Sequence, residues 1–418
     1  MIKRIFTDYK IQIKNFSSLS VLNITNYVFS LITFPYIVRV IGVEKFGLIN
    51  FAAAFVAYFG ILTDYGFSWS ATQLVSLNRD EKNKLDKNYS AVISIKIILI
   101  VISFILLSII IFSLDFFRVN YELYYLSFLF VVGTSIFPNW FFQGIEKMNY
   151  IANITIFFRA ISVAAIFIFI NSSSDYLLLV GINGITTLLV GIFALGFIQS
   201  KYKIKFTFPS KGEIIYYLKY SWDYFISNIG ISLYTNTNTF ILGLFASNTV
   251  VGYWAAADKI RYAILMIYGT FHQSVFPYLT KLINEDFDNA IRKVKKIIRF
   301  GGLIAFVISL ITFLFSSQIC TIILGEAYIN SIPILQIISW LPFIIYLSNI
   351  FGIQLMLNLG YKKTFAKIIL FAAVINIILS FIIVPLYFAI GTAIAVTVTE
   401  IFVTTSTYLY LRRKNILK

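Results

Sequence analysis

Charged side chains that interrupt long apolar runs are the residues of this chain best suited to chemistry. A charge at the centre of a membrane-spanning helix costs about 2.5 to 3.5 kcal/mol on insertion scales, so it is retained only for a function or for a partner. A cation there suits an anionic group such as a phosphate, and a carboxylate suits a proton or a cation. The residues of this kind are Asp64, Lys96, Arg159, Lys219, Asp223, Asp258, Lys259, Arg261 and Glu400.

Arg159 is the cation that the pattern favours most for binding an anionic ligand. It lies about nine residues into its apolar run, near mid-membrane at a rise of 1.5 Å per residue, and it has no acidic neighbour one turn away. Arg261, Lys259 and Lys219 are further cationic candidates. Two of these cations have an acidic residue one helical turn away. Lys219 precedes Asp223 by four residues, and Arg261 follows Asp258 by three. Each such pair is either a local ion pair or part of a functional site.

The carboxylates are candidates for coupling to an ion gradient. Glu400 lies about eleven residues into the last run, near mid-membrane, and either couples to a proton or cation or forms a structural bond to Arg159 or another span. Asp64, Asp223 and Asp258 are the other coupling candidates. We interpret Lys96, like Lys219, as a lysine that reaches toward the cytoplasmic surface of the membrane.

Amide side chains add a polar lining to the seventh apolar run. Asn228 and Asn236 belong to a stripe of polar residues spaced at three- and four-residue steps, which indicates one helix face. Amides and tyrosines in a wet cavity can hydrogen-bond sugar hydroxyls and stack on sugar rings. The stripe therefore suits a glycan without specifying which one.

Composition excludes several other functions. The chain is 59% hydrophobic and carries a formal net charge of +16, which we place at the anionic membrane surface rather than on a nucleic acid. A single cysteine and a single histidine give no metal-ligand cluster, and no cofactor is expected. The polar gaps are short, so we expect no soluble catalytic domain and no enzyme activity.

The elements that position these residues are apolar runs long enough to span a membrane. Such helices need about 20 residues, and we predict an all-α membrane protein with twelve of them, starting near residues 16, 46, 89, 121, 150, 176, 214, 251, 298, 332, 364 and 389. Nearly all Lys and Arg residues in the gaps lie in every second gap or in the two terminal tails. By the positive-inside rule both termini are cytoplasmic, in a multi-pass protein of the bacterial inner membrane.

A weak internal repeat divides the chain into halves. FGLINFAA (46–53) matches VGYWAAA (251–257), and FFQGIEKMNYIANI (141–154) matches LMLNLGYKKTFAKI (355–368). Both offsets are close to half of the chain length. We therefore predict two six-helix lobes, residues 1–205 and 206–418, with the substrate site between them.

Several motifs resemble a known family of membrane transporters. The segment TFPYIVRVIGVEKFGLINFAAAFVAYFGILTDYGFSWSATQLVS (33–76) is similar to the first two helices of O-antigen repeat-unit flippases of the Wzx type. Further similar segments are NWFFQGIEKMNYI (139–151), SNIGISLYTNTNTFILGLF (227–245), VGYWAAADKI (251–260) and PYLTKL (277–282). The resemblance implies the two-lobe MATE-like fold of the multidrug/oligosaccharidyl-lipid/polysaccharide (MOP) exporter superfamily.

The resemblance also implies a function. It predicts transfer of an undecaprenyl-pyrophosphate-linked oligosaccharide, an O-antigen repeat unit, from the cytoplasmic to the periplasmic leaflet by alternating access. Partners would be membrane lipids and the polymerase and chain-length regulator of the same pathway. Two alternatives stay open, a drug or cation exporter of the same superfamily and an integral-membrane polysaccharide polymerase or ligase.

Overall fold

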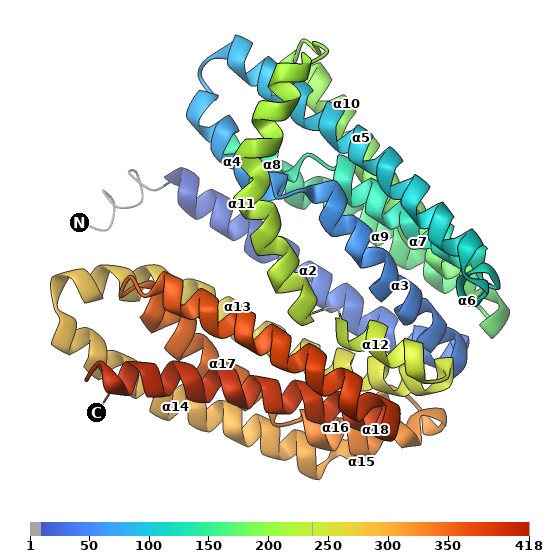
Figure 1. Ribbon diagram of the computed structural model, residues 1–418, viewed down its shortest axis with the longest axis vertical. Helices are drawn as coiled ribbons and strands as arrows, with labels where there is room; N and C mark the ends of the chain where they lie inside the picture. Colours follow the sequence, from blue (N-terminus) through green and yellow to red (C-terminus); the bar gives the residue numbers. More distant parts are fainter. Residues whose placement is uncertain (1–9, 236, 418) are drawn as a thin grey trace. The chain divides into compact units, whose positions relative to one another are not determined.

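The computed structural model describes residues 10–235 and 237–417, and each regular element in these two ranges is a helix (Figure 1). The chain forms two compact units. Unit 1 contains α2 (Lys10–Ile41) and Ala52–Ser232, and unit 2 contains Gly42–Phe51 and the described residues from Leu233 onward. The first nine residues of α3 (Val43–Asp64) thus belong to unit 2 together with Gly42, and the rest of α3, from Ala52 onward, belongs to unit 1. The lobe boundary expected at residues 205 and 206 stays a prediction.

Unit 1 is built from long helices with short ones at their ends. After α2 and α3 it contains α4 (Phe67–Asn78), α5 (Lys82–Ser113), α6 (Asp115–Arg118), α7 (Tyr121–Ile136), α8 (Asn139–Gly144), α9 (Met148–Phe169), η1 (Ser173–Asp175), α10 (Tyr176–Tyr202) and most of α11 (Lys211–Thr235). Within this unit α7 packs along α10, α2 along α9 and α4 against α8.

Unit 2 repeats the pattern of long helices with shorter segments between them. It contains α12 (Thr237–Phe245), α13 (Asn248–Glu285), α14 (Phe287–Leu314), α15 (Ser316–Ile323), η2 (Glu326–Ser331), α16 (Ile332–Ile338), α17 (Leu341–Asn349), the π-helical segment η3 (Ile350–Leu357) and α18 (Lys362–Arg413). Here α12, α17 and η3 all pack against α18.

The helix α18 is a hairpin rather than one rod. Phe388 inside it has φ 49° and ψ −123°, which no α-helix contains. The amide of Asn376 donates to the hydroxyl of Thr399 at 3.3 Å, although 23 residues of continuous helix would separate them by about 35 Å. The chain therefore reverses near Phe388, and Figure 1 shows the two arms of α18 side by side. The sequence placed helix starts near 364 and 389, on the two sides of this reversal.

Nine helical segments within the described ranges are long and apolar enough to cross a membrane. The charged helices α11 and α13 are not among them, and the hairpin α18 counts as one. The expected number of twelve spans and the cytoplasmic position of both termini stay predictions. Helices also begin earlier than the apolar runs suggest. α14 starts at Phe287, because Asp286 caps it by accepting a hydrogen bond from the backbone N–H of Asn289 at 3.0 Å.

Small residues allow the closest helix packing in unit 1. A Cβ placed on Gly133 of α7 would lie 2.4 Å from the backbone of Thr187 in α10, and one on Gly184 would lie 2.9 Å from the carbonyl of Leu126. Glycines at such positions let two helix backbones approach closely, as is common between membrane helices. The α7–α10 pair is therefore held by backbone proximity as much as by side-chain volume.

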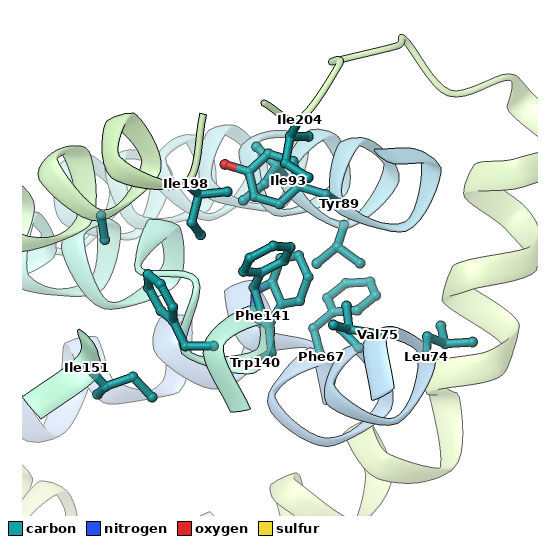
Figure 2. Close-up of a cluster of buried hydrophobic side chains, with 14 of the residues drawn as sticks. Phe67, Leu74, Val75, Tyr89, Ile93, Trp140, Phe141, Ile151, Ile198 and Ile204 are labelled. Atoms are coloured by element: carbon teal, nitrogen blue, oxygen red, sulfur yellow. The ribbon is translucent and has the colours of Figure 1, made fainter. Parts of the chain in front are cut away.

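A buried aromatic core holds the motif segments of unit 1 together. Trp140, Phe141 and Phe142 of α8 are almost fully buried, and they pack with Phe67 of α4 and Tyr89 of α5 (Figure 2). By contrast, one side of α5 is covered with exposed apolar residues: Ile97, Ile98, Val101, Ile102, Phe104 and Ile105. Apolar side chains that face outward along a whole helix are expected of a protein whose solvent there is lipid.

Candidate functional site

A sharp turn between α3 and α4 creates the most polar buried site of unit 1. Tyr65 and Gly66 both have positive φ, 46° and 77°, and they end α3 at Asp64. A Cβ on Gly66 would lie 2.6 Å from the Cβ of Tyr224 and 2.8 Å from the backbone nitrogen of Phe225. Only glycine fits this close approach, so the turn is held directly against α11. The carboxylate of Asp64 is thereby placed between α3, α4, α5 and α11.

Three donors surround the carboxylate of Asp64. The ammonium of Lys96 lies 3.2 Å from Oδ1, and the hydroxyl of Ser68 donates to the same oxygen at 2.7 Å. The amide of Asn228 donates to Oδ2 at 3.4 Å. Asp64 and Asn228 were candidates on separate grounds from the sequence, and the structure brings them together from 164 residues apart.

The burial of Lys96 contradicts the prediction that its side chain reaches the membrane surface. Its side chain is only 3% exposed, whereas that of Asp64 is 24% exposed. The interpretation of Lys96 as a lysine that reaches to the membrane surface is therefore wrong. It failed because the sequence does not reveal that α5 carries this ammonium past the carboxylate that ends α3.

Further polar contacts fix α11 beside this site. Ser70 and Ser221 share a hydrogen bond of 2.7 Å, and both residues are fully buried. The hydroxyls of Tyr220 and Tyr224 both donate to the side-chain oxygen of Gln73, at 2.9 and 3.1 Å. These amide and hydroxyl groups form a polar strip that leads along α4 and α11 away from Asp64.

Arg159 lies on α9, the helix that packs along α2. Its side chain is half-buried, and within residues 10–235 and 237–417 it makes no ion pair or hydrogen bond. Arg159 and Glu400 belong to different units, so their pairing stays a prediction. Glu400 itself is buried in the second arm of α18.

Three of the candidate charges of unit 2 lie in the first half of α13. Arg261 forms an ion pair with Asp258 at 2.7 Å, one turn away, so the local contact that the spacing allows is present. The ammonium of Lys259 lies 5.1 Å from the centre of the Phe46 ring. By contrast Lys219 on α11 is exposed and has no ion pair in the part of the chain that the structure describes, so the local pair expected with Asp223 does not form. Asp223 is also exposed, and Asn236 lies outside the described residues.

Two contacts in unit 2 were not expected from the sequence. The hydroxyl of Ser380 donates to Asn238 at 3.4 Å and joins α12 to the first arm of α18, while the amide of Asn376 donates to Thr399 and joins the two arms to each other. The sequence did not indicate these contacts, because single polar residues within apolar runs give no periodic pattern.

The start of α3 packs against the start of α13 through a reciprocal contact. A Cβ on Gly47 would lie 1.7 Å from the carbonyl of Asn248, and a Cβ on Gly252 would lie 2.2 Å from the carbonyl of Val43. These are the glycines of the two repeat segments, and the same sequence offset relates both sides of the contact. Gly42–Phe51 therefore belongs with unit 2 because its backbone interlocks with α13.

Comparisons with known proteins identify the family. The model of the polysaccharide biosynthesis protein family matches residues 13–283. The chain is 34% identical over 404 residues to a protein named as an O-antigen transporter in Escherichia coli (strain K12), covering 97% of each. It is 28% identical to one of the same name in Shigella dysenteriae, covering 93% of this chain and 97% of that protein.

The chain belongs to the polysaccharide biosynthesis protein family. Solved structures agree on the fold. An inward-facing multidrug resistance MATE transporter of the MOP superfamily has a TM-score of 0.72 at 13% identity, over 92% of this chain and 94% of that one. The lipid II flippase MurJ has a TM-score of 0.71 at 16% identity, over 94% and 87%. This member is thus a helical protein of the MOP fold, with nine helical segments in its described ranges that are long and apolar enough to cross a membrane.

The structure also shows where the sequence motifs shared with this family lie. The segments 67–76 and 139–144 of this polysaccharide biosynthesis protein correspond to α4 and α8, which pack on each other around the core of Figure 2. A Cβ on Gly144 would lie 2.5 Å from Val75, so the two motifs interlock through a glycine. Many of these motif positions are core positions, whereas Asp64 and Ser68 of the first motif and Asn228 of a later one meet in the polar site.

Proposed function

We propose that this transporter flips undecaprenyl-pyrophosphate-linked O-antigen or related polysaccharide repeat units from the cytoplasmic to the periplasmic leaflet of the inner membrane. The relatives named as O-antigen transporters support the glycan, and the similarity to a lipid II flippase supports a lipid-linked substrate. The chain would use alternating access between two six-helix lobes, residues 1–205 and 206–418, with twelve spans and both termini in the cytoplasm.

The observation that carries the proposal is the polar site at the α3–α4 turn. It combines a buried ammonium, a carboxylate and an amide within apolar helices, next to a strip of tyrosines and Gln73. An ammonium suits a pyrophosphate, and hydroxyl and amide groups suit sugar hydroxyls. A transporter of apolar drugs would have no need for either.

In our proposal, cations of other helices also contact the head group during transport. Arg159 offers a bidentate guanidinium to the pyrophosphate near mid-membrane, while Arg261, Lys259 and Lys219 guide the head group at other depths. The candidates for ion coupling are Glu400, Asp64, Asp223 and Asp258, since a carboxylate inside a membrane can bind a proton or a cation.

The decisive experiment follows the lipid-linked intermediate in cells that lack the protein. We expect single undecaprenyl-pyrophosphate-linked repeat units to accumulate on the cytoplasmic face of the inner membrane. Accumulation on the periplasmic face would instead indicate a polymerase or ligase. No accumulation, together with increased sensitivity to cationic drugs, would indicate a drug exporter.

A substitution at Arg159 tests the proposed head-group role. Arg159→Ala should abolish surface polysaccharide at a normal protein level, and Arg159→Lys should restore it in part, because an ammonium keeps the charge but loses the bidentate hydrogen bonds. Arg118→Ala, at an exposed arginine of the same unit, is the matched control and should have no effect. Wild-type polysaccharide in a well-expressed Arg159→Ala strain would exclude Arg159 from the head-group site.

A further inference from the structure

The surroundings of Lys96 are unusual for a buried ammonium. Lys96 carries three N–H donors, and Asp64 is its single hydrogen-bond acceptor among residues 10–235 and 237–417. With a side chain that is 3% exposed, the remaining donors have little access to bulk water. A buried cation with unused donors is costly, so this ammonium is suited to a second, stronger anion.

Asp64 has the opposite character. Its carboxylate also accepts hydrogen bonds from Ser68 and Asn228, and a quarter of the side chain is exposed. If Lys96 moved away, two neutral donors would still hold the carboxylate. The pair is therefore asymmetric, because Asp64 tolerates the loss of its partner better than Lys96 does.

The position of the pair along the helices fits an entering head group. Asp64 lies 14 residues before the end of α4 at Asn78, and Lys96 lies 14 residues after the start of α5 at Lys82. Lys96 is therefore about 20 Å along α5 from the turn that joins α4 and α5, and its ion pair holds Asp64 at a similar distance. The hydroxyls of Tyr220 and Tyr224 and the amide of Gln73 lie between the pair and that turn, along α4 and α11.

We propose that the ammonium of Lys96 is exchanged between Asp64 and the pyrophosphate of the lipid-linked substrate, and that each exchange protonates Asp64. This rests on the proposed function. Pyrophosphate oxygens accept the N–H groups of Lys96, which stays charged throughout. Asp64 keeps its bonds to Ser68 and Asn228 and takes one proton from water, because the neighbouring cation is now neutralised by another anion. When the substrate leaves, Lys96 returns to Asp64 and the proton is released.

Substrate binding and protonation of one carboxylate are then linked, and each favours the other by the same factor. Lowering the pH should strengthen substrate binding until Asp64 is fully protonated. Asp64→Asn resembles the protonated state and should bind well at every pH. A variant with an uncharged residue in place of Lys96 should bind the substrate weakly at every pH. A structural ion pair alone would produce neither pattern.

The test measures binding of undecaprenyl pyrophosphate to the purified full-length protein in lipid nanodiscs between pH 5 and 8. Wild type should bind more tightly at low pH, by up to about tenfold per pH unit for one linked proton. Relative to wild type, Asp64→Asn should lose this dependence, and the double variant Asp64→Asn/Lys96→Met should bind about tenfold or more weakly at pH 5. The double variant removes both charges together, so it avoids leaving one buried charge alone.

The control is the double variant Lys82→Met/Asp86→Asn, which removes another ion pair of α5. It should bind like wild type at every pH. Wild-type binding by Asp64→Asn/Lys96→Met would overturn the exchange and leave the proposed function intact. An unchanged pH dependence in Asp64→Asn would overturn the link to Asp64. No binding of undecaprenyl pyrophosphate by wild type would overturn the proposed function and the exchange with it.

Discussion

Two ion pairs with poorly exposed cations, one in each unit, are held in different ways. In unit 2, Asp258 and Arg261 are one turn apart on α13, so the helix itself brings them together. In unit 1, Asp64 and Lys96 are 32 residues apart and meet because α3 ends at a turn beside α5. The first pair can form wherever α13 is helical, whereas the second exists only in the folded unit.

The largest difference should appear when the acidic partner is removed. Asp64→Ala leaves the buried ammonium of Lys96 uncompensated and should lower the free energy of unfolding by about 3 kcal/mol. Asp258→Ala removes a bond between neighbours on one helix and should cost about 0.5 kcal/mol. Thermal unfolding of the purified protein in detergent measures both. Equal losses in the two variants would contradict the contrast between a tertiary pair and a local one.

The same contrast explains what the sequence could and could not predict. A spacing of three residues made a local pair of Asp258 and Arg261 one of two alternatives, since helix geometry places both side chains on one face. No spacing predicts that Lys96 meets Asp64, because that depends on which helices become neighbours. Apolar length predicted a helical membrane protein and the break between the arms of α18, but not the early start of α14, which a capping carboxylate sets.

The sequence predicted only part of the candidate site, because it does not show which helices become neighbours. Asp64 was found because its charge stands out in an apolar run and Asn228 because it belongs to a polar stripe, and the structure adds that they touch. Lys219 and Asp223 have the spacing of an ion pair, but both are exposed and no ion pair joins them in the described part of the chain, where a surface pair would gain little. Spacing permits such a contact without requiring it.

The two units can also be compared at one glycine in each, where the backbone has positive φ. Gly66 in unit 1 and Gly42 in unit 2 have nearly the same φ, 77° and 76°. A Cβ on Gly42 would meet nothing within 4 Å, whereas one on Gly66 would lie 2.6 Å from the Cβ of Tyr224. The backbone strain of an alanine is therefore alike at both positions, and only Gly66 adds a steric clash.

We expect Gly42→Ala to lower the free energy of unfolding by about 1 to 2 kcal/mol, which is the strain of an L-residue at positive φ. Gly66→Ala should lower it clearly more, because α11 must move away. That movement would separate Asn228 from Asp64 and should also reduce transport. Unfolding temperature and surface polysaccharide are the two measurements. If both alanine variants were equally stable, the turn would not be held against α11 as the structure indicates.

The smallest effect should come from the cap at the start of α11, which is local in sequence like the pair in unit 2. The backbone N–H of Ser210 donates to the carboxylate of Glu213 at 2.7 Å, and that of Glu213 donates back to the Ser210 hydroxyl at 3.3 Å. The hydrogen bonds from the Ser210 backbone and side chain lower the pKa of Glu213, with a smaller contribution from the charge of Lys87.

Because the folded-state pKa of Glu213 is depressed, its stabilising effect is present above the unfolded pKa of about 4.3 and is lost as the pH falls through the folded value. Glu213→Gln should therefore unfold at a slightly lower temperature than wild type at pH 7, and the two should converge as the pH falls below the folded-state pKa of Glu213. The Ser210→Ala variant, which removes the hydroxyl but keeps the backbone donor, should show a smaller difference at pH 7. A difference between wild type and Glu213→Gln that widens in acid would mean that the carboxylate is stabilised in its protonated form. In that case the start of α11 would depend on contacts elsewhere in unit 1 rather than on its own cap.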